Sequence, residues 1–260
     1  MNISELCNVL DNIFKIKQFS SIDSSLNGLQ VGSSNKEIKK IGFSVSASLN
    51  IFKLAKKSNC DMVFVHHGLF WGKPESITGY KYERIKFLLD NDIALFACHL
   101  PLDTHEKFSN NAGMTEELQL EDVRGFASYK GFNMGLYGTL KNALSYEEIK
   151  KRVCTSVIID EPKTVLCTNK MKKYNKVGIV SGSGSKDVYE AIELGLEVFI
   201  TGDFSFNEYF PVLESGITLM CLGHYETERY GVIRIMNFLR SNYNIETLFL
   251  EDIKEGNENE

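Results

Sequence analysis

Hydrophobic and polar positions along the chain follow two periods in alternation. Short uninterrupted apolar runs, rich in β-branched and aromatic residues, are typical of strands buried in a sheet. Apolar residues spaced three and four apart between these runs are typical of amphipathic helices. The runs predict strands over 38–45, 62–65, 93–98, 132–140, 177–180, 198–200, 217–222 and 245–250, and the spacings predict helices over 3–14, 49–57, 78–89, 109–118, a short stretch after 145, 189–194 and 226–239.

Two of the predicted helices begin with a capping box. Asn2 is followed three residues later by Glu5, and Ser145 is followed three residues later by Glu148. In this arrangement the two side chains can bond backbone amides that the first helical turn leaves without a partner. The chain therefore specifies the start of these two helices locally.

The order of elements in the first half of the chain returns in the second half. A strand, a helix and a strand span 25 positions from Gly42 to His67, and the same order spans 25 positions from Gly178 to Asp203. Alternating strands and helices predict α/β units. We therefore expect two similar interlinked α/β lobes with mixed, largely parallel sheets and a metal site in the cleft between them. The expected lobes comprise 1–125 with 226–260, and 126–225.

Chemistry-bearing side chains follow the predicted strands. His66 and His67 end the run at 62–65, and Gly68 then breaks the strand. Ligands of open α/β sheets bind beyond the carboxyl ends of the strands, so two imidazoles there are well placed to hold metal. Because adjacent residues of an extended chain point in opposite directions, one histidine on each of two ions is the easier arrangement. Two histidines that merely cap the strand are the alternative.

Further histidines and carboxylates stand at comparable positions. His99 and His224 also follow predicted strands, and His105 comes six residues after His99. His224 and Glu228 are four apart at a helix start and can share a face. Glu226 would point elsewhere, as a solvated charge or one that stabilises the helix N-terminus. Two more carboxylates lie near strand ends, Asp103 and Asp203.

Imidazole and carboxylate ligands without thiolates argue against a structural cysteine-type zinc site. Such donors suit Zn, Fe, Mn, Co or Ni. Five candidate ligands are too many for one open catalytic ion. They suit two ions that share a carboxylate, about 3.5–4 Å apart.

Two other features have a structural and a functional interpretation. The Gly/Ser segment 181–186 could bind phosphate through its backbone amides, but it lacks the Walker spacing, and a plain strand-to-helix turn is favoured. Trp71 could stack on a base, but core packing or a subunit contact is favoured.

Composition and charge narrow the class of protein. The 260 residues are 43% hydrophobic and 24% charged, as in a globular protein. The net charge of −5 and the absence of a basic stripe argue against nucleic acid as a partner. Six cysteines without a Cys-x-x-Cys pair suit free thiols in a reducing cytoplasm. No apolar run approaches the ~18 residues that a membrane span needs.

Several motifs together resemble one known family. HHGLFW, HLPLD followed by Asn110-Asn111-Ala112, TGD and GHYETER are similar, in order and spacing, to those of the Nif-three-like dinuclear-metal family. Its members are often labelled GTP cyclohydrolase I type II homologues, and NGLQVG at 27–32 is similar to the family's opening motif. The resemblance extends to about Leu239, and the length looks like the short bacterial form. One departure is Phe204-Ser-Phe-Asn-Glu208, which stands where some members have histidines.

The resemblance implies a ligand set and an assembly. Carried over to this chain, the ligands of two divalent ions, such as Zn, Fe or Mn, are His66, His67, Asp103, His224 and Glu228. The resemblance also implies a homo-hexameric toroid whose metal sites face an inner cavity.

His99 lies outside the implied ligand set. It is a candidate catalytic residue that assists proton transfer, and a hydrogen-bonded structural histidine at a strand end is the alternative.

Two functions are compatible with these residues. The first is a metal-dependent hydrolase acting on a nucleotide-like substrate, and the family label suggests GTP ring opening, although no guanine-reading motif is visible. The second is a non-catalytic, toroidal metal-binding protein for interaction or metal handling. An open coordination position would favour the first, and saturated protein ligation the second. A third interpretation, a DNA-associated ring, is weakened by the acidic charge.

Overall fold

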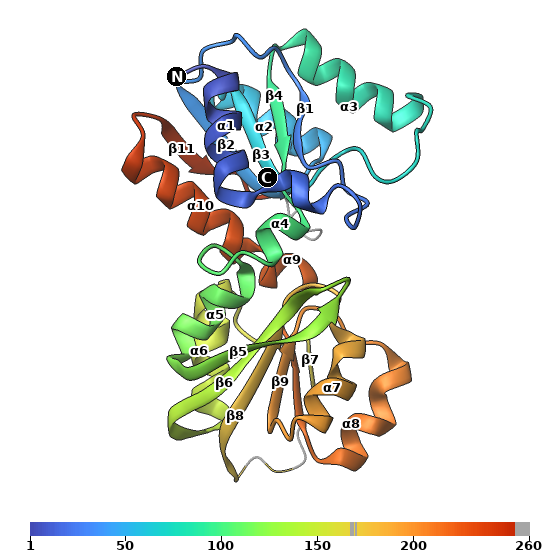
Figure 1. Cartoon of the computed structure of the whole chain (residues 1–260), viewed down its shortest axis with the longest axis vertical. Coiled ribbons are helices and arrows are strands. Elements are labelled where there is room, and N and C mark those ends of the chain that lie inside the picture. The colour runs from blue at the N-terminus through green and yellow to red at the C-terminus, as the bar shows by residue number, and fades with distance from the viewer. Residues whose placement is uncertain (167–168, 170, 253–260) are drawn as a thin grey trace, which may run out of the picture. The chain divides into compact units, whose positions relative to one another are not determined.

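A computed structural model describes residues 1–166, 169 and 171–252, and it contains two compact α/β units (Figure 1). One unit is Met1–Leu102 with Val232–Glu260, and the other is Asp103–Gly231. Each unit has its own sheet and its own helices, and we describe each by itself. Cys167 and residues 253–260 lie outside the described residues.

The unit boundaries differ from those expected from the sequence. Residues 103–125 and 226–231 were expected in the first lobe but belong to the second unit. The reason is the pairing of residues 120–129, whose strand joins residues 132–145 in the second sheet. A polar strand of this kind carries no strong hydrophobic signal, so the sequence pattern alone did not reveal it.

The first unit has a five-stranded sheet in the order β1-β4-β3-β2-β11. Strands β4, β3, β2 and β11 are parallel, and only β1 is antiparallel to its neighbour. The elements of this unit are α1 (Ile3–Phe14), the 3-10 helix η1 (Ile16–Phe19), β1 (Gly28–Val31), β2 (Lys40–Ser46), α2 (Leu49–Lys57), β3 (Met62–His67), α3 (Gly79–Asp90), β4 (Ala94–Ala97) and β11 (Glu246–Phe249); α4 (Leu100–Asp103) and α10 (Arg229–Asn242) each include residues of both units.

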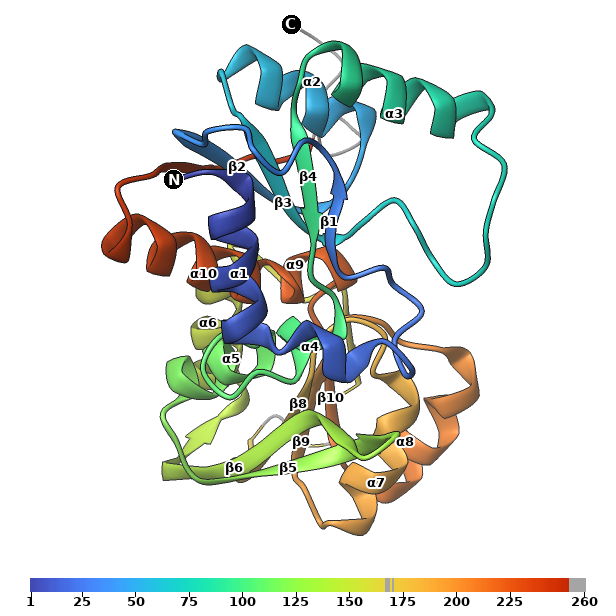
Figure 2. The same ribbon diagram turned by 45° about the horizontal axis from the view of Figure 1, so that its top comes forward.

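Side chains of β3 alternate between two packed faces of this sheet. Val63 and Val65 pack into a core with residues of α2 and α3. On the other face Phe64 lies between Phe43 and Phe96, with ring centroids 5.3 and 5.6 Å apart. Figures 1 and 2 show α1 and α10 on that second face. In a sheet covered on both faces, a ligand binds beyond the carboxyl ends of the strands.

The second unit has a six-stranded mixed sheet in the order β5-β6-β8-β9-β10-β7. Strands β8, β9 and β10 are parallel, and the flanking strands are antiparallel. Its elements are α5 (Asn110–Leu118), β5 (Leu120–Tyr129), β6 (Phe132–Ser145), α6 (Tyr146–Val157), β7 (Thr164–Leu166), β8 (Lys173–Val180), η2 (Ser185–Asp187), α7 (Val188–Glu193), β9 (Val198–Thr201), η3 (Phe206–Glu208), α8 (Tyr209–Ser215), β10 (Thr218–Cys221) and α9 (His224–Thr227).

Helices cover both faces of the second sheet as well. Val198 and Ile200 face a core shared with α5 and α6, whereas Phe199 faces a core shared with α7 and α8. The order β8-α7-β9-α8-β10 matches β2-α2-β3-α3-β4 in the first unit. The repeat and the mixed, largely parallel sheets predicted from the sequence are therefore confirmed.

Both predicted capping boxes are present. The Asn2 side chain accepts the Glu5 amide and Glu5 accepts the Asn2 amide, each at 2.9 Å. Ser145 and Glu148 form the same reciprocal pair at the start of α6. Each cap is worth about 1 kcal/mol of helix stability.

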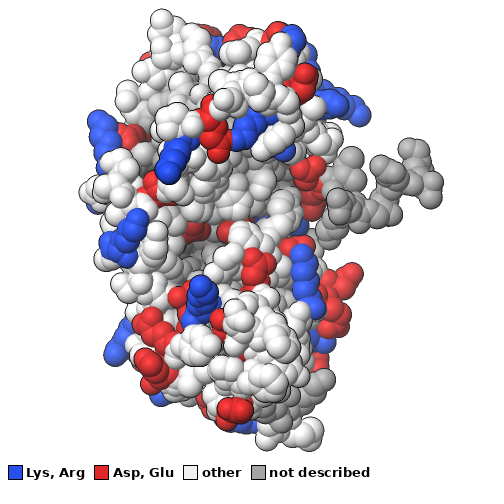
Figure 3. All heavy atoms as spheres, turned by 90° about the vertical axis from the view of Figure 1, so that its right-hand side faces the viewer, with Lys and Arg blue, Asp and Glu red and all other residues white. Residues whose placement is uncertain are grey.

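Surface features agree with the composition. On the face drawn in Figure 3, acidic and basic side chains are interspersed, and no continuous basic stripe crosses that face. Within the described residues, no helix is both long and apolar enough to cross a membrane.

Candidate functional site

Three histidines gather at the carboxyl ends of β3 and β4 in the first unit. His66 and His67 end β3, and His99 follows β4, its parallel neighbour. Their ring centroids are 4.5 to 5.6 Å apart, and one ring nitrogen or more of each lies within 4.8 Å of the others. The rings of His66 and His67 thus lie close together, although the two residues are adjacent within β3. The cluster has the donor atoms and the spacing to hold a metal ion.

A protein group of the first unit lies at the Nδ1 atom of each of these rings. The Nδ1 of His66 is 2.9 Å from the Cys98 carbonyl oxygen, the Nδ1 of His67 is 3.2 Å from the Ser46 hydroxyl, and the Nδ1 of His99 is 3.0 Å from an Asp23 carboxylate oxygen. A carbonyl oxygen only accepts, so His66 carries its proton on Nδ1 and keeps the Nε2 lone pair available when neutral. This is the arrangement that orients histidines as metal ligands.

Asp23 is a site residue that sequence reasoning missed. Its side chain is 1% exposed, and besides His99 it accepts the Leu100 amide at 3.0 Å and the Asn27 side-chain amide at 2.7 Å. Burial raises the pKa of Asp23, but hydrogen bonds from His99, Asn27 and the Ser25 amide outweigh it, so the net pKa is lowered. An ionised Asp23 therefore orients His99. The only sequence signal was the Asn27-Gly28 turn that follows it.

The second unit contains a histidine held between two carboxylates. His224 begins α9, and its Nε2 lies 3.1 Å from an oxygen of Glu228, four residues on. Its Nδ1 lies 2.6 Å from Asp203, which also accepts the Ser183 hydroxyl at 2.9 Å. The hydrogen bond with Glu228, opposed by burial and reinforced by Asp203, raises the pKa of His224 to about 9. The four-residue spacing thus brings an imidazole and a carboxylate together.

Gly182 makes room for this pair. Its φ of +64° is in the left-handed region, and a Cβ there would lie 2.3 Å from the Glu228 carboxylate and 3.4 Å from the Nε2 of His224. Other amides of the segment 181–186 are already bonded: Ser181 donates to Asn111 and Gly184 donates to the Gly182 carbonyl. The segment therefore packs against the donor pair as a strand-to-helix turn, and these amides are not available to phosphate.

Other candidate residues have clear local partners. Asp103 ends α4 and accepts the Asn110 side-chain amide at 3.1 Å. Glu226 is not a solvated charge, because it is 7% exposed and pairs with Lys163 at 2.9 Å; it lies in the first turn of α9, as its alternative role at the helix N-terminus requires. His105 accepts two backbone amides, from Lys107 and Phe108, at its Nδ1. His105 therefore stabilises the turn before α5.

Trp71 lies beside the histidine cluster. It is half-buried, its indole N–H donates to the Gly68 carbonyl at 2.9 Å, and its ring centroid is 4.9 Å from that of His99 and 6.0 Å from that of His67. The indole is thus part of the surroundings of the cluster rather than of the sheet core.

The predicted site residues fall into two sets. His66, His67 and His99 belong to the first unit, whereas Asp103, His224 and Glu228 belong to the second. The structure brings together the three histidines of the first set and the His224–Glu228 pair of the second. That both sets ligate the same ions stays a prediction.

Comparisons with known proteins identify relatives along nearly the whole chain. A sequence model of the Duf34/NIF3 (NGG1p interacting factor 3) family matches residues 1–256. Proteins from Borreliella burgdorferi and from Archaeoglobus fulgidus, each called GTP cyclohydrolase 1 type 2 homolog, are 38% identical over 251 residues, which is 96% of this chain and 98% of each relative.

Solved structures show the same fold. TTHA1606 from Thermus thermophilus has a TM-score of 0.85 at 31% identity, covering 98% of this chain and 100% of that one. Reduced HcgD from Methanocaldococcus jannaschii has a TM-score of 0.84 at 29% identity, covering 97% and 98%. A protein described as ybgI, of unknown function, has a TM-score of 0.87 at 29% identity, covering 98% and 99%.

Proposed function

The chain belongs to the Duf34/NIF3 (NGG1p interacting factor 3) family, and we propose that it is a divalent-metal protein that hydrolyses a nucleotide-like substrate. The observation that carries the proposal is the cluster of three histidines at the carboxyl ends of β3 and β4. The name of the curated relatives, GTP cyclohydrolase 1 type 2 homolog, makes a guanine nucleotide the first substrate to test.

The donor atoms fit a divalent ion of borderline softness. In the first unit the donors are His66 and His67, whose Nδ1 atoms are held by a carbonyl and a hydroxyl, so their Nε2 atoms face the proposed ion. In the second unit the donors are an imidazole and a carboxylate 3.1 Å apart. No thiolate takes part, which suits Zn, Fe or Mn.

Two ions per chain are part of this proposal. The ligands would be His66 and His67 from the first unit, and Asp103, His224 and Glu228 from the second. Glu228 is 5% exposed, and a buried carboxylate is stabilised by a cation beside it. Bound ions would supply Lewis acidity, which activates water near neutral pH and stabilises developing negative charge.

His99 is the candidate for proton transfer. Its Nδ1–H donates to Asp23, so the carboxylate fixes the ring and stabilises the imidazolium that forms when Nε2 takes a proton. The side chain is 21% exposed, so a substrate or water can reach it. His99 would take a proton from the attacking water and return it to the leaving group.

A second candidate function is a non-catalytic metal-binding ring. Exposed aromatic side chains on η3 and α8 favour an assembly of copies: Phe206 is 72% exposed and Phe210 57%. Their rings contact each other and Tyr209, with centroids 5.3 to 6.2 Å apart, and together form an apolar patch of the kind found at interfaces. A homo-hexamer is the expected assembly, and it is compatible with either function.

One variant distinguishes the three roles that His99 could have: proton transfer, structural support and metal ligation. In metal-loaded protein, His99→Ala is expected to lower nucleotide turnover by about 10²–10⁴-fold while metal content stays close to wild type. Unchanged turnover per metal-loaded chain with a lower melting temperature would show that His99 is structural. Loss of metal would make His99 a ligand. No turnover of any nucleotide by metal-loaded wild type would leave the metal-binding ring as the function.

A further inference from the structure

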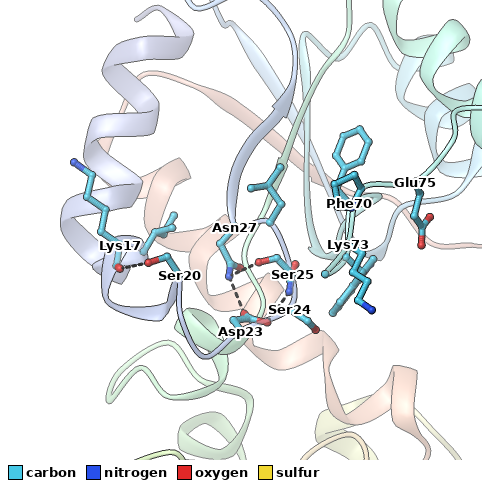
Figure 4. Close-up of a pocket in the computed structure, with 14 residues that line it drawn as sticks. Lys17, Ser20, Asp23, Ser24, Ser25, Asn27, Phe70, Lys73 and Glu75 are labelled. Carbon is cyan, nitrogen blue, oxygen red and sulfur yellow. Dashed lines mark hydrogen bonds between the residues drawn. The ribbon is translucent and has the colours of Figure 1, made fainter.

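The first unit contains a pocket of about 570 Å³ beside the histidine cluster. This volume is in the range of small-molecule sites. Its walls come from two segments, 16–27 and 70–75. Figure 4 shows Lys17 and Ser20 on one side and Phe70, Lys73 and Glu75 on the other, with Asp23, Ser24, Ser25 and Asn27 between them. The ligand set described above includes no residue of this pocket, and the proton transfer uses only Asp23 of its lining.

The two walls are joined by backbone hydrogen bonds. The Leu26 amide donates to the Phe70 carbonyl at 3.0 Å, and the Gly72 amide donates to the Ser24 carbonyl at 2.5 Å. A pocket whose walls are tied together in this way exists before a ligand enters.

One side of the pocket offers aromatic surface. Phe70 and Trp71 both line it, and each is half-buried. The indole N–H is held by the Gly68 carbonyl, so the Trp71 ring has a fixed orientation and loses little freedom when a ligand packs on it. Aromatic side chains of this kind stack on planar bases of any type.

The charges at the pocket favour an anion. Lys73 is exposed and, within the described residues, forms no ion pair, whereas the acidic Glu75 pairs with Lys81. Asp23 is enclosed by its hydrogen-bond donors and is 1% exposed. Lys17 also lines the pocket, but Figure 4 shows its ammonium turned away from Ser24 and Lys73. A phosphate would therefore be held by Lys73.

We propose that this pocket binds the base and phosphate of a nucleotide, with the planar base against Phe70 and Trp71 and the phosphate at Lys73. The inference rests on the proposed function in that it places the substrate there. Trp71 and Asp23, which line the pocket, also contact His99, one at 4.9 Å between ring centroids and the other through a hydrogen bond. A bound nucleotide thus lies next to the proton-transfer residue.

The chain provides its own reporter, because Trp71 is the only tryptophan. Protein freed of metal with a chelator is titrated with GMP, guanosine and inorganic phosphate while tryptophan fluorescence is recorded. We expect saturable quenching by GMP, binding of guanosine about tenfold weaker, and no quenching by phosphate. Lys73→Ala should weaken GMP binding about five- to tenfold without changing guanosine binding. Lys17→Ala is the matched control, with GMP binding expected within about twofold of wild type.

Three results would overturn the inference. They are an absence of saturable quenching by GMP, equal GMP affinity of Lys73→Ala and Lys17→Ala, and quenching that requires added metal and disappears in His66→Ala. Metal content measured on the same wild-type preparation keeps the two proposals apart. Metal-loaded protein without nucleotide binding contradicts only the pocket, and GMP binding by protein that takes up no metal contradicts only the metal-dependent hydrolase.

Discussion

Adding one carbon atom at Gly182 should weaken metal binding without removing a ligand. In Gly182→Ala the new Cβ would lie 2.3 Å from the Glu228 carboxylate oxygen, and real Cβ atoms essentially never come closer than 3.0 Å. The carboxylate must therefore move by about 0.7 Å, several times the roughly 0.2 Å tolerance of a metal–ligand distance. We expect the divalent-metal affinity to fall about ten- to a hundredfold, as when a ligand loses its positioning partner.

Gly195→Ala is the matched control for the backbone. Gly195 has the same φ of +64°, and a Cβ there meets nothing within 4 Å. Both variants should lose about 1–2 kcal/mol of folding free energy from left-handed strain. Their melting temperatures should therefore fall by similar amounts. Only Gly182→Ala should lose affinity for Zn²⁺ or Mn²⁺ in a competition titration against a chromogenic chelator. Equal metal affinities of the two variants would refute the assignment of Glu228 as a ligand.

Three further predictions concern pH and assembly. The pKa of His224 is raised from 6.5 to about 9, so the charged imidazole stabilises the folded, metal-free protein. This stabilisation is fully present below pH 6.5 and is lost as pH rises through about 9. After discounting for solvent exposure, the stability lost is about 1 kcal/mol. Denaturation midpoints of His224→Gln should not show this loss between pH 6.5 and 9, and parallel pH profiles of wild type and variant would contradict the prediction. Burial, with repulsion from Glu190, raises the pKa of Asp187 from 3.8 to about 6, so its contribution to stability is present below 3.8 and lost as pH rises through 6. Asp187→Asn should therefore be about 1–2 kcal/mol more stable above pH 6 and unchanged at low pH, and equal denaturation midpoints above pH 6 would show the reasoning wrong. Light scattering should show a hexamer that dissociates when Phe206 and Phe210 are both replaced by serine, and a wild-type monomer at micromolar concentration would rule the assembly out.

The elements of the fold could be predicted where sequence signals are local. Helix α2 spans Leu49–Lys57 as predicted, because Ser48 caps its start and its apolar residues share a face. Strands β1, β5 and β7 were missed for the opposite reason. They are only partly buried and lack an apolar run. Strands β1 and β7 depend on pairing with strands distant in sequence, and β5 depends on pairing with β6, the next strand along the chain.

The site could be predicted as far as each residue follows a strand or shares a helical turn. His66, His67 and His99 follow β3 and β4, and the parallel pairing of those strands brings them together. Asp23 could not be predicted, because it lies 76 positions from its partner His99 and only the folded chain joins them. The closeness of the His66 and His67 rings was also not predicted, since the alternation of side chains along a strand places adjacent residues on opposite faces.

Metal content per chain tests the central claim most directly. Elemental analysis of protein purified without added metal, and again after loading and removal of excess metal, is compared for wild type, Glu228→Ala and Glu226→Ala. Glu226 is the control, because it is a glutamate of the same segment whose carboxylate already forms an ion pair with Lys163. We predict two divalent ions per chain in wild type and in Glu226→Ala, and loss of most of both ions in Glu228→Ala. One ion or none in loaded wild type, or full occupancy in Glu228→Ala, would contradict the proposed metal centre.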